Sequence, residues 1–239
     1  MPTRGPDIMK WVRSCIISWG LAMVLASCVT DPARPTGRTN AELAARVASE
    51  QVLDVLFVGN SYSFRVPAGL AREAEKRGLK VRVDQVTHGG WTLRKHAVSG
   101  QTLDQIRSGK WDVIVFQEKS RIPSQPAMRA LFMVPALRTL VAEARKAGSV
   151  PVLYQTWGYR DGDPKVADDD FFAMNRRVRE GYLVASKNAG GIHVIPAGDA
   201  WEDEARRGGL AELFLPDGSH PSAKGNALTA AAFAESITP

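Results

Sequence analysis

Short apolar runs alternate with longer amphipathic stretches along most of the chain. Residues 52–58 (VLDVLFV) are apolar except for Asp54 and rich in valine, which is typical of a strand buried on both faces of a parallel sheet. Similar runs predict strands at 81–86, 112–116, 150–155 and 192–195. Between and after these runs, the pattern predicts helices at 67–77, 101–108, 127–147, 171–189, 199–207 and 222–235.

Strands that alternate with helices predict a parallel sheet with helices on both faces, because right-handed crossovers leave few other arrangements. We therefore predict an α/β fold, a three-layer α/β/α sandwich around a five-stranded parallel sheet, over residues 51–239. In such sheets the ligand crevice lies outside the carboxyl ends of the strands. Polar residues directly after each strand are therefore candidates for function.

The first fifty residues follow a different pattern. Lys10 and Arg13 precede an apolar run that ends in Leu-Ala-Ser-Cys at Cys28. The run is shorter than the roughly 20 residues that span a hydrocarbon core, which favours a signal peptide at 1–27 over a permanent membrane helix. Its last four residues resemble a bacterial lipobox, in which the cysteine is lipidated. The alternative is an ordinary signal peptide with Cys28 as an incidental thiol.

Both interpretations export the protein. With a lipid on Cys28, residues 28–50 are the lipidated cysteine and a flexible, proline-bearing tether, and the membrane is a partner through that lipid. We predict a membrane-anchored lipoprotein of the bacterial cell envelope. Val29 after the cysteine favours the outer membrane in a host that has one.

The composition and charge of the chain limit the classes of function that the protein can have. The chain has 239 residues, 44% of them hydrophobic, which is enough for one globular domain with a full core. Its formal net charge is +6, but the lysines and arginines are spread along the chain and form no cluster. We therefore predict no nucleic-acid partner.

A serine follows the first predicted strand. Gly59-Asn60-Ser61 would place the Ser61 hydroxyl at the carboxyl edge of the sheet, where it can attack a carbonyl. Gly-Asn-Ser is also a common turn sequence, so this motif alone does not establish a nucleophile.

An acid and a histidine precede the last predicted helix. In Asp217-Gly218-Ser219-His220, the spacing lets the carboxylate fold back onto the imidazole Nδ1–H, which leaves Nε2 free as a base. The same residues also suit a turn in which Asp217 caps the helix. If the last helix packs beside the first strand, Ser61, His220 and Asp217 form a minimal set for acyl transfer.

Two other strand ends offer donors to an oxyanion. Gly89-Gly90 supplies backbone amides that can approach an oxyanion without a Cβ in the way, and Gln117 supplies a side-chain amide. The alternatives are a plain turn for the glycines and a structural amide for Gln117.

Together these motifs resemble the SGNH hydrolase superfamily, also called GDSL esterases and lipases, from about residue 52 onward. Ser61 fits the first sequence block of that superfamily, Gly90 the second, and Asp217 with His220 the Asp-x-x-His of the fifth. The third block departs from the pattern, because the asparagine of many members is absent. Gln117 looks like the variant of carbohydrate acetylesterase branches and of a less characterised branch with Gly-Asn-Ser starts.

The resemblance implies a serine esterase that forms an acyl-enzyme on Ser61, with an oxyanion hole made by Ser61, Gly90 and Gln117 and with no metal or cofactor. The implied substrate is an ester-bearing small molecule or glycan. Short-chain or O-acetyl esters are favoured, because the chain has no long apolar insertion to form an acyl tunnel. An acyltransferase on the same triad and a catalytically silent ligand-binding lipoprotein remain alternatives.

Some neighbouring residues have less distinct roles. We predict a structural role for His88 and His96, with contact to a substrate as the alternative. For Trp157 and Tyr159 we predict core packing or loop cover, with stacking on a sugar face as the alternative. The acidic run at 168–170 is predicted to cap the following helix and not to bind a metal.

Overall fold

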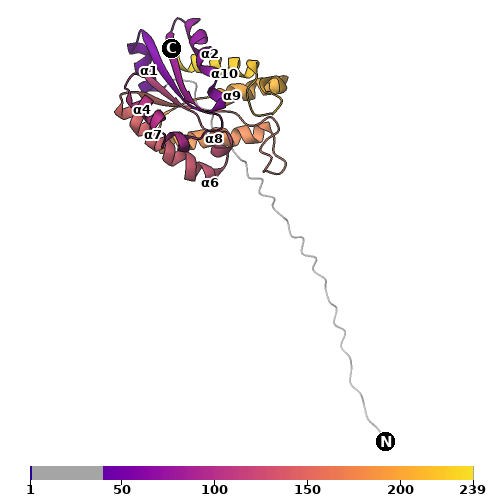
Figure 1. The fold of residues 1–239 in the computed structure, drawn as a ribbon. Helices are drawn as coiled ribbons and strands as arrows, with labels where there is room; N and C mark the ends of the chain where they lie inside the picture. The colour runs from indigo at the N-terminus through magenta and orange to yellow at the C-terminus, as the bar shows by residue number, and fades with distance from the viewer. Residues whose placement is uncertain (2–39, 239) are drawn as a thin grey trace. The chain divides into compact units, whose positions relative to one another are not determined.

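The computed structural model describes Met1 and residues 40–238. Five strands form one parallel sheet in the order β2-β1-β3-β4-β5 (Figure 1), which confirms the predicted α/β architecture. The strands are β1 (Val52–Gly59), β2 (Lys80–Thr87), β3 (Val113–Phe116), β4 (Val150–Tyr154) and β5 (His193–Ile195). In this order the chain changes direction across the sheet beside β1, and ligand crevices form at such points.

Strand β1 supplies side chains to two hydrophobic cores, one on each face of the sheet. Leu53, Val55 and Phe57 join the first core, and Leu56 and Val58 join the second. Side chains along a strand alternate between its faces, so a strand covered on both sides reads as a nearly continuous apolar run.

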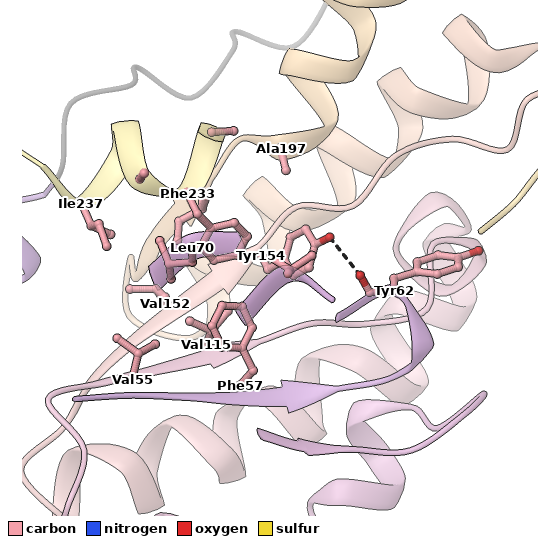
Figure 2. Packing of buried hydrophobic residues seen from close by; sticks show 14 of the residues in the cluster. Val55, Phe57, Tyr62, Leu70, Val115, Val152, Tyr154, Ala197, Phe233 and Ile237 are labelled. Atoms are coloured by element: carbon pink, nitrogen blue, oxygen red, sulfur yellow. Dashed lines mark hydrogen bonds between the residues drawn. The ribbon is translucent and has the colours of Figure 1, made fainter. Parts of the chain in front are cut away.

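Among the described residues, helices on one side of the sheet supply most of the helical side chains of the first core, shown from close by in Figure 2. They are α1 (Ala41–Ser49), α2 (Val66–Glu75), α9 (Ala197–Glu204) and α10 (Ala223–Ile237). Phe233 of α10 packs against Phe57 and Tyr154, with ring centroids 5.3 and 4.9 Å apart. The Tyr154 hydroxyl donates to the carbonyl of Tyr62 at 3.4 Å, which ties the core to the segment that follows β1 (Figure 2).

Helices on the other side of the sheet cover the second core, and Figure 1 shows α7 and α8 there, opposite α2 and α10. These helices are α3 (Leu93–His96), α4 (Gly100–Arg107), α5 (Arg121–Ser124), α6 (Pro126–Met128), α7 (Val134–Lys146) and α8 (Phe171–Asn188). The helix predicted at 127–147 is interrupted by a π turn, Arg129–Met133, between α6 and α7. Asp170 caps α8 by accepting from the Ala173 N–H at 2.7 Å, as predicted for the acidic run.

The predicted boundary between tether and domain at residue 51 is wrong. Ala41–Ser49 form α1, whose Leu43 and Val47 are buried in the first core, and the Asn40 side chain caps the helix by accepting from the Leu43 N–H at 3.0 Å. The folded domain therefore includes residues from about Asn40 onward.

The predicted signal peptide, Cys28 and the first part of the tether lie outside the described residues. Within residues 40–238, no helix combines the length and apolar character needed to cross a membrane.

Candidate active site

Ser61 begins a short 3₁₀ turn, Ser61–Ser63, directly after β1. Asn60 caps this turn by accepting from the Tyr62 N–H at 3.2 Å. Gly59 has to be a glycine, because a Cβ there would lie 2.5 Å from the side-chain oxygen of Gln117. The strand end therefore packs closely against the neighbouring strand and presents Ser61 at the carboxyl edge of the sheet.

The structure brings Ser61, His220 and Asp217 together. Ser61 Oγ lies 2.9 Å from His220 Nε2, and His220 Nδ1 lies 2.6 Å from Asp217 Oδ2. A carboxylate at Nδ1 holds the ring proton on that nitrogen, which leaves the Nε2 lone pair facing the serine hydroxyl. This is the hydrogen-bonded order of a nucleophile, its base and the group that orients the base.

Asp217 is held as a carboxylate by its surroundings. Burial by itself would raise its pKa, but hydrogen bonds from the backbone N–H groups of His220 and Ser219 and from the His220 ring outweigh that effect. The pKa of Asp217 is lowered to about 2. The carboxylate that meets the His220 ring therefore stays ionised at neutral pH.

The turn that carries Asp217 and His220 is closed on itself. The Leu215 N–H donates to the His220 carbonyl at 2.8 Å, and Gly218 adopts a φ of +67° that L side chains rarely adopt. The loop after β4 also holds this turn in place, because the Trp157 indole N–H donates to the Ser219 carbonyl at 3.1 Å.

An aromatic stack supports the histidine. The Tyr62 ring meets His220 edge-on at 5.3 Å and stacks on Trp157 at 5.2 Å, and Trp157 in turn stacks on Trp201 at 3.7 Å. Trp157 is fully buried, so its predicted packing role is confirmed. Tyr159 is partly buried and packs against both cores, as predicted, and it also lines a pocket beside Ser61.

That pocket has a volume of about 480 Å³ and opens beside the serine. Segments that follow β1, β2, β3 and β4, together with the turn before α10, contribute to its wall. The lining residues are Asn60, Ser61, Tyr62, Gly90, Lys119, Tyr159, Asp161, Gly162, Pro164, Asp217, Gly218, Ser219 and His220.

Two backbone N–H groups at the pocket have no acceptor of their own. Ser61 and Gly90 both line it, and within residues 40–238 neither backbone N–H donates a hydrogen bond. Gly90 has a φ of +69°, a backbone conformation that favours glycine. Unpaired N–H groups beside a nucleophile are suitable donors to the oxyanion that forms when it attacks a carbonyl.

The predicted oxyanion role of Gln117 is corrected. Its side chain is fully buried, and its Oε1 accepts from the Asn60 N–H at 2.8 Å and the Ser63 hydroxyl at 3.0 Å. Its Nε2 donates to the Glu118 carbonyl at 2.8 Å. The Asn60 N–H fixes which end of the amide is the oxygen. Gln117 is therefore a structural amide that holds the serine turn, and its amino group does not reach the pocket.

Glu118 was not predicted from the sequence as part of the site, although an acidic residue directly after an apolar strand was a signal. Its fully buried carboxyl group accepts from the backbone N–H groups of Leu93 at 3.1 Å and Lys119 at 2.8 Å. Burial raises the pKa of Glu118 to about 8 in spite of these hydrogen bonds. Glu118 therefore joins the end of β3 to the start of α3, close in sequence to Gly90.

The two histidines near β2 are part of the scaffold around the same segment. His96 is fully buried, and its ring bonds the Gly59 carbonyl at 2.8 Å and the Thr102 hydroxyl at 2.9 Å, so its predicted structural role is confirmed. The His88 ring packs on Trp91 with centroids 4.1 Å apart. Asn60 completes this scaffold by donating its side-chain amide to the Trp91 carbonyl at 3.0 Å.

Comparisons with known proteins add to this geometry. No family model matches the sequence, and no curated protein matches it. Solved structures do match. A candidate SGNH hydrolase from Slackia heliotrinireducens is 28% identical, with 78% of this chain and 99% of that chain covered and a TM-score of 0.62.

Two further structures share the fold at lower identity. A DUF4886 family protein from Bacteroides uniformis ATCC 8492 is 21% identical, with 78% of this chain and 83% of that chain covered and a TM-score of 0.66. A variant of Axe2, an acetylxylan esterase from Geobacillus stearothermophilus, is 17% identical, with 77% of this chain and 94% of that chain covered and a TM-score of 0.60.

The chain shares the fold of SGNH (GDSL-like) hydrolases and is similar to a candidate member of that superfamily. Its Ser61, His220 and Asp217 lie in hydrogen-bonded order at one pocket.

Proposed function

We propose that the protein cleaves carboxylic esters through a covalent intermediate on Ser61, with His220 as general base and Asp217 as the group that orients it. The observation that carries this proposal is the 2.9 Å approach of Ser61 Oγ to His220 Nε2 at the wall of an open pocket, with Asp217 2.6 Å behind the ring. A neutral imidazole held in one tautomer is the base that a serine hydroxyl needs.

The proposed reaction has two halves. Ser61 Oγ bonds to the ester carbonyl carbon while its proton passes to His220 Nε2, and the oxyanion accepts from the backbone N–H groups of Ser61 and Gly90. Collapse breaks the bond to the alcohol, which takes the proton from His220. Water then attacks the acyl-enzyme with His220 again as base, and the carboxylic acid leaves. Each oxyanion donor typically contributes about 10²- to 10³-fold in rate.

Short acyl groups, including O-acetyl groups on a glycan, are the proposed substrates. The described residues of the pocket wall combine polar side chains and glycines with two tyrosine rings and include no leucine, isoleucine, valine, methionine or phenylalanine, which suits a short acyl group better than a long hydrocarbon chain. Tyr159 offers a ring at this wall on which a sugar can rest. Axe2, an acetylxylan esterase, has the same fold.

Hydrolysis of 4-nitrophenyl acetate and 4-nitrophenyl octanoate tests the proposal. We expect turnover that favours the acetate ester and falls by at least about 10³-fold in Ser61→Ala and in His220→Ala, because each variant lacks one half of the proton transfer. Ser49→Ala, which removes an exposed hydroxyl just before β1, is the matched control and keeps full activity.

Full turnover by Ser61→Ala would contradict the proposal. A strong preference for octanoate would move the substrate class to lipids. Delivery of the acyl group to an added sugar in preference to water would favour the acyltransferase alternative.

A further inference from the structure

One lysine at the pocket wall lacks an ionic partner among the described residues. Asp161 is ion-paired with Arg160 at 2.8 Å, and Asp217 accepts a hydrogen bond from the His220 ring at 2.6 Å. Lys119 is the one lysine or arginine among the described residues of the wall, and within residues 40–238 it forms no ion pair. Both carboxylates of the wall therefore have partners, whereas the ammonium group of Lys119 has none.

The backbone of Lys119 is fixed although its side chain is exposed. Lys119 lies three residues beyond the end of β3, between Glu118 and Ser120, which are both fully buried. Its N–H donates to Glu118 Oε1 at 2.8 Å, and its carbonyl accepts from the Ile122 N–H at 2.8 Å. The Ser120 hydroxyl donates into the interior, to Thr156 Oγ1 at 2.9 Å. These contacts hold the base of the lysine at the pocket while its ammonium stays free.

Glu118, the nearest carboxyl group in sequence, forms no ion pair with that ammonium within the described residues. Its two oxygens accept from the backbone N–H groups of Leu93 and Lys119 and are buried. A free ammonium beside a nucleophile attracts an anion, and the compact lysine head binds a carboxylate as a point charge with three donors.

We propose that Lys119 binds a carboxylate group of the substrate, so that the preferred esters carry a carboxylate on either the alcohol or the acyl part. This assignment rests on the proposed esterase function of the same pocket. Lys119 is then a specificity residue that contacts the substrate away from the ester bond. Because the side chain is exposed and hydrated, its effect is moderate, about three- to tenfold in kcat/KM.

Two matched pairs of esters test whether the carboxylate that Lys119 binds belongs to the alcohol part or to the acyl part of the substrate. The alcohol arm compares 4-acetoxybenzoate with its methyl ester, and the acyl arm compares 4-nitrophenyl succinate with its methyl ester. In each arm, the measured quantity is kcat/KM for the charged ester divided by kcat/KM for the neutral ester. We expect this ratio to fall about three- to tenfold in Lys119→Gln in at least one of the two arms. Lys119→Arg keeps most of the ratio, and added salt reduces it in the wild-type protein.

Lys110→Gln is the matched control. It removes the same charge from an exposed lysine that precedes β3, at the opposite edge of the sheet from the pocket, and it leaves both ratios unchanged. Unchanged ratios in Lys119→Gln would overturn the proposal. An equal loss on charged and neutral esters would also overturn it, because Lys119 would then act on the reaction centre and not on a substrate carboxylate.

Calorimetric titration of 4-hydroxybenzoate and of succinate, the carboxylate-bearing products of the two arms, keeps this test separate from the proposed function. If no ester is turned over, the esterase proposal fails by itself. Binding of either anion that weakens in Lys119→Gln but not in Lys110→Gln then still supports the lysine site. Equal binding of both anions by all three proteins, or no binding of either, overturns it.

Discussion

At the scale of single residues, one carboxylate both shapes the turn before α10 and, in the proposed mechanism, orients the base. Asp217 accepts from the backbone N–H groups of Ser219 at 2.8 Å and His220 at 2.9 Å, and its other oxygen meets the imidazole. All three partners lie within three residues of it in the sequence. Because the arrangement is local, the Asp-x-x-His spacing was sufficient to predict it.

The position of Gln117 was not predictable in the same way. Its partners are Asn60 and Ser63, from a distant part of the chain, and its place depends on the missing Cβ of Gly59. A sequence pattern predicts that polar groups gather after β3, but not which of them turns inward. Here Gln117 and Glu118 are buried, and Lys119 is exposed at the pocket.

His96 makes stability depend on pH. Its burial lowers its pKa from the ordinary 6.5 to about 4, so the folded state holds the ring neutral where the unfolded chain protonates it. The contribution of the neutral His96 ring to stability is therefore fully present above about pH 6.5 and is lost as the pH falls towards 4. We expect this residue to contribute up to about 3 kcal/mol to the fall in the free energy of unfolding between pH 7 and pH 4.

Urea unfolding across that pH range measures the effect. His96→Gln keeps an amide donor for the Gly59 carbonyl and cannot titrate, so its stability curve is flatter at acid pH than that of the wild-type protein. Parallel curves for the two proteins would show that His96 does not carry this dependence.

At the scale of elements, helix α10 sets the position of the catalytic turn. Ser222 caps α10 by accepting from the Gly225 N–H at 3.1 Å, two residues after His220. Gly225 lets the helix approach its neighbours, because a Cβ there would lie 2.4 Å from the Leu213 carbonyl oxygen and 2.7 Å from the Trp201 ring. Trp201 supports Trp157 in the aromatic stack, so a shift at Gly225 would be transmitted towards His220.

Gly225→Ala is therefore expected to lower both stability and activity. Overpacking of this kind costs about 1–3 kcal/mol, whereas alanine normally favours a helix over glycine. Gly100→Ala is the matched control, since Gly100 is also helical but has open space where the Cβ would lie, and it leaves stability unchanged or raised. Denaturant unfolding and ester hydrolysis measure both variants. Equal stability of the two variants would contradict this account of α10.

The longer elements were predictable, and the shorter ones were not. Strands with a continuous apolar run and helices such as α8 have enough residues for their pattern to stand out. The helices α3 and α5 have four residues each, too few for any period to show. Residues 41–49 were predicted as part of the tether but form α1, which buries only two apolar side chains, Leu43 and Val47.

At the scale of the whole domain, the parallel sheet gathers residues that lie far apart in the sequence. Ser61, Gly90, Lys119, Tyr159 and His220 come from different connections, and the order of the strands brings them to one pocket. The alternation of strands and helices predicts this gathering, since the carboxyl ends of parallel strands share an edge. Export and lipidation at Cys28 stay predictions, because they concern residues outside the described part of the chain.

Labelling with a fluorophosphonate followed by peptide mass spectrometry tests whether Ser61 is an activated nucleophile, because such reagents capture a serine only where a base and an oxyanion hole activate it. We expect one adduct, on Ser61, that is absent in Ser61→Ala and forms much more slowly in His220→Ala. A protein that hydrolyses esters while Ser61 stays unlabelled, or that carries the adduct on another residue, would contradict this expectation.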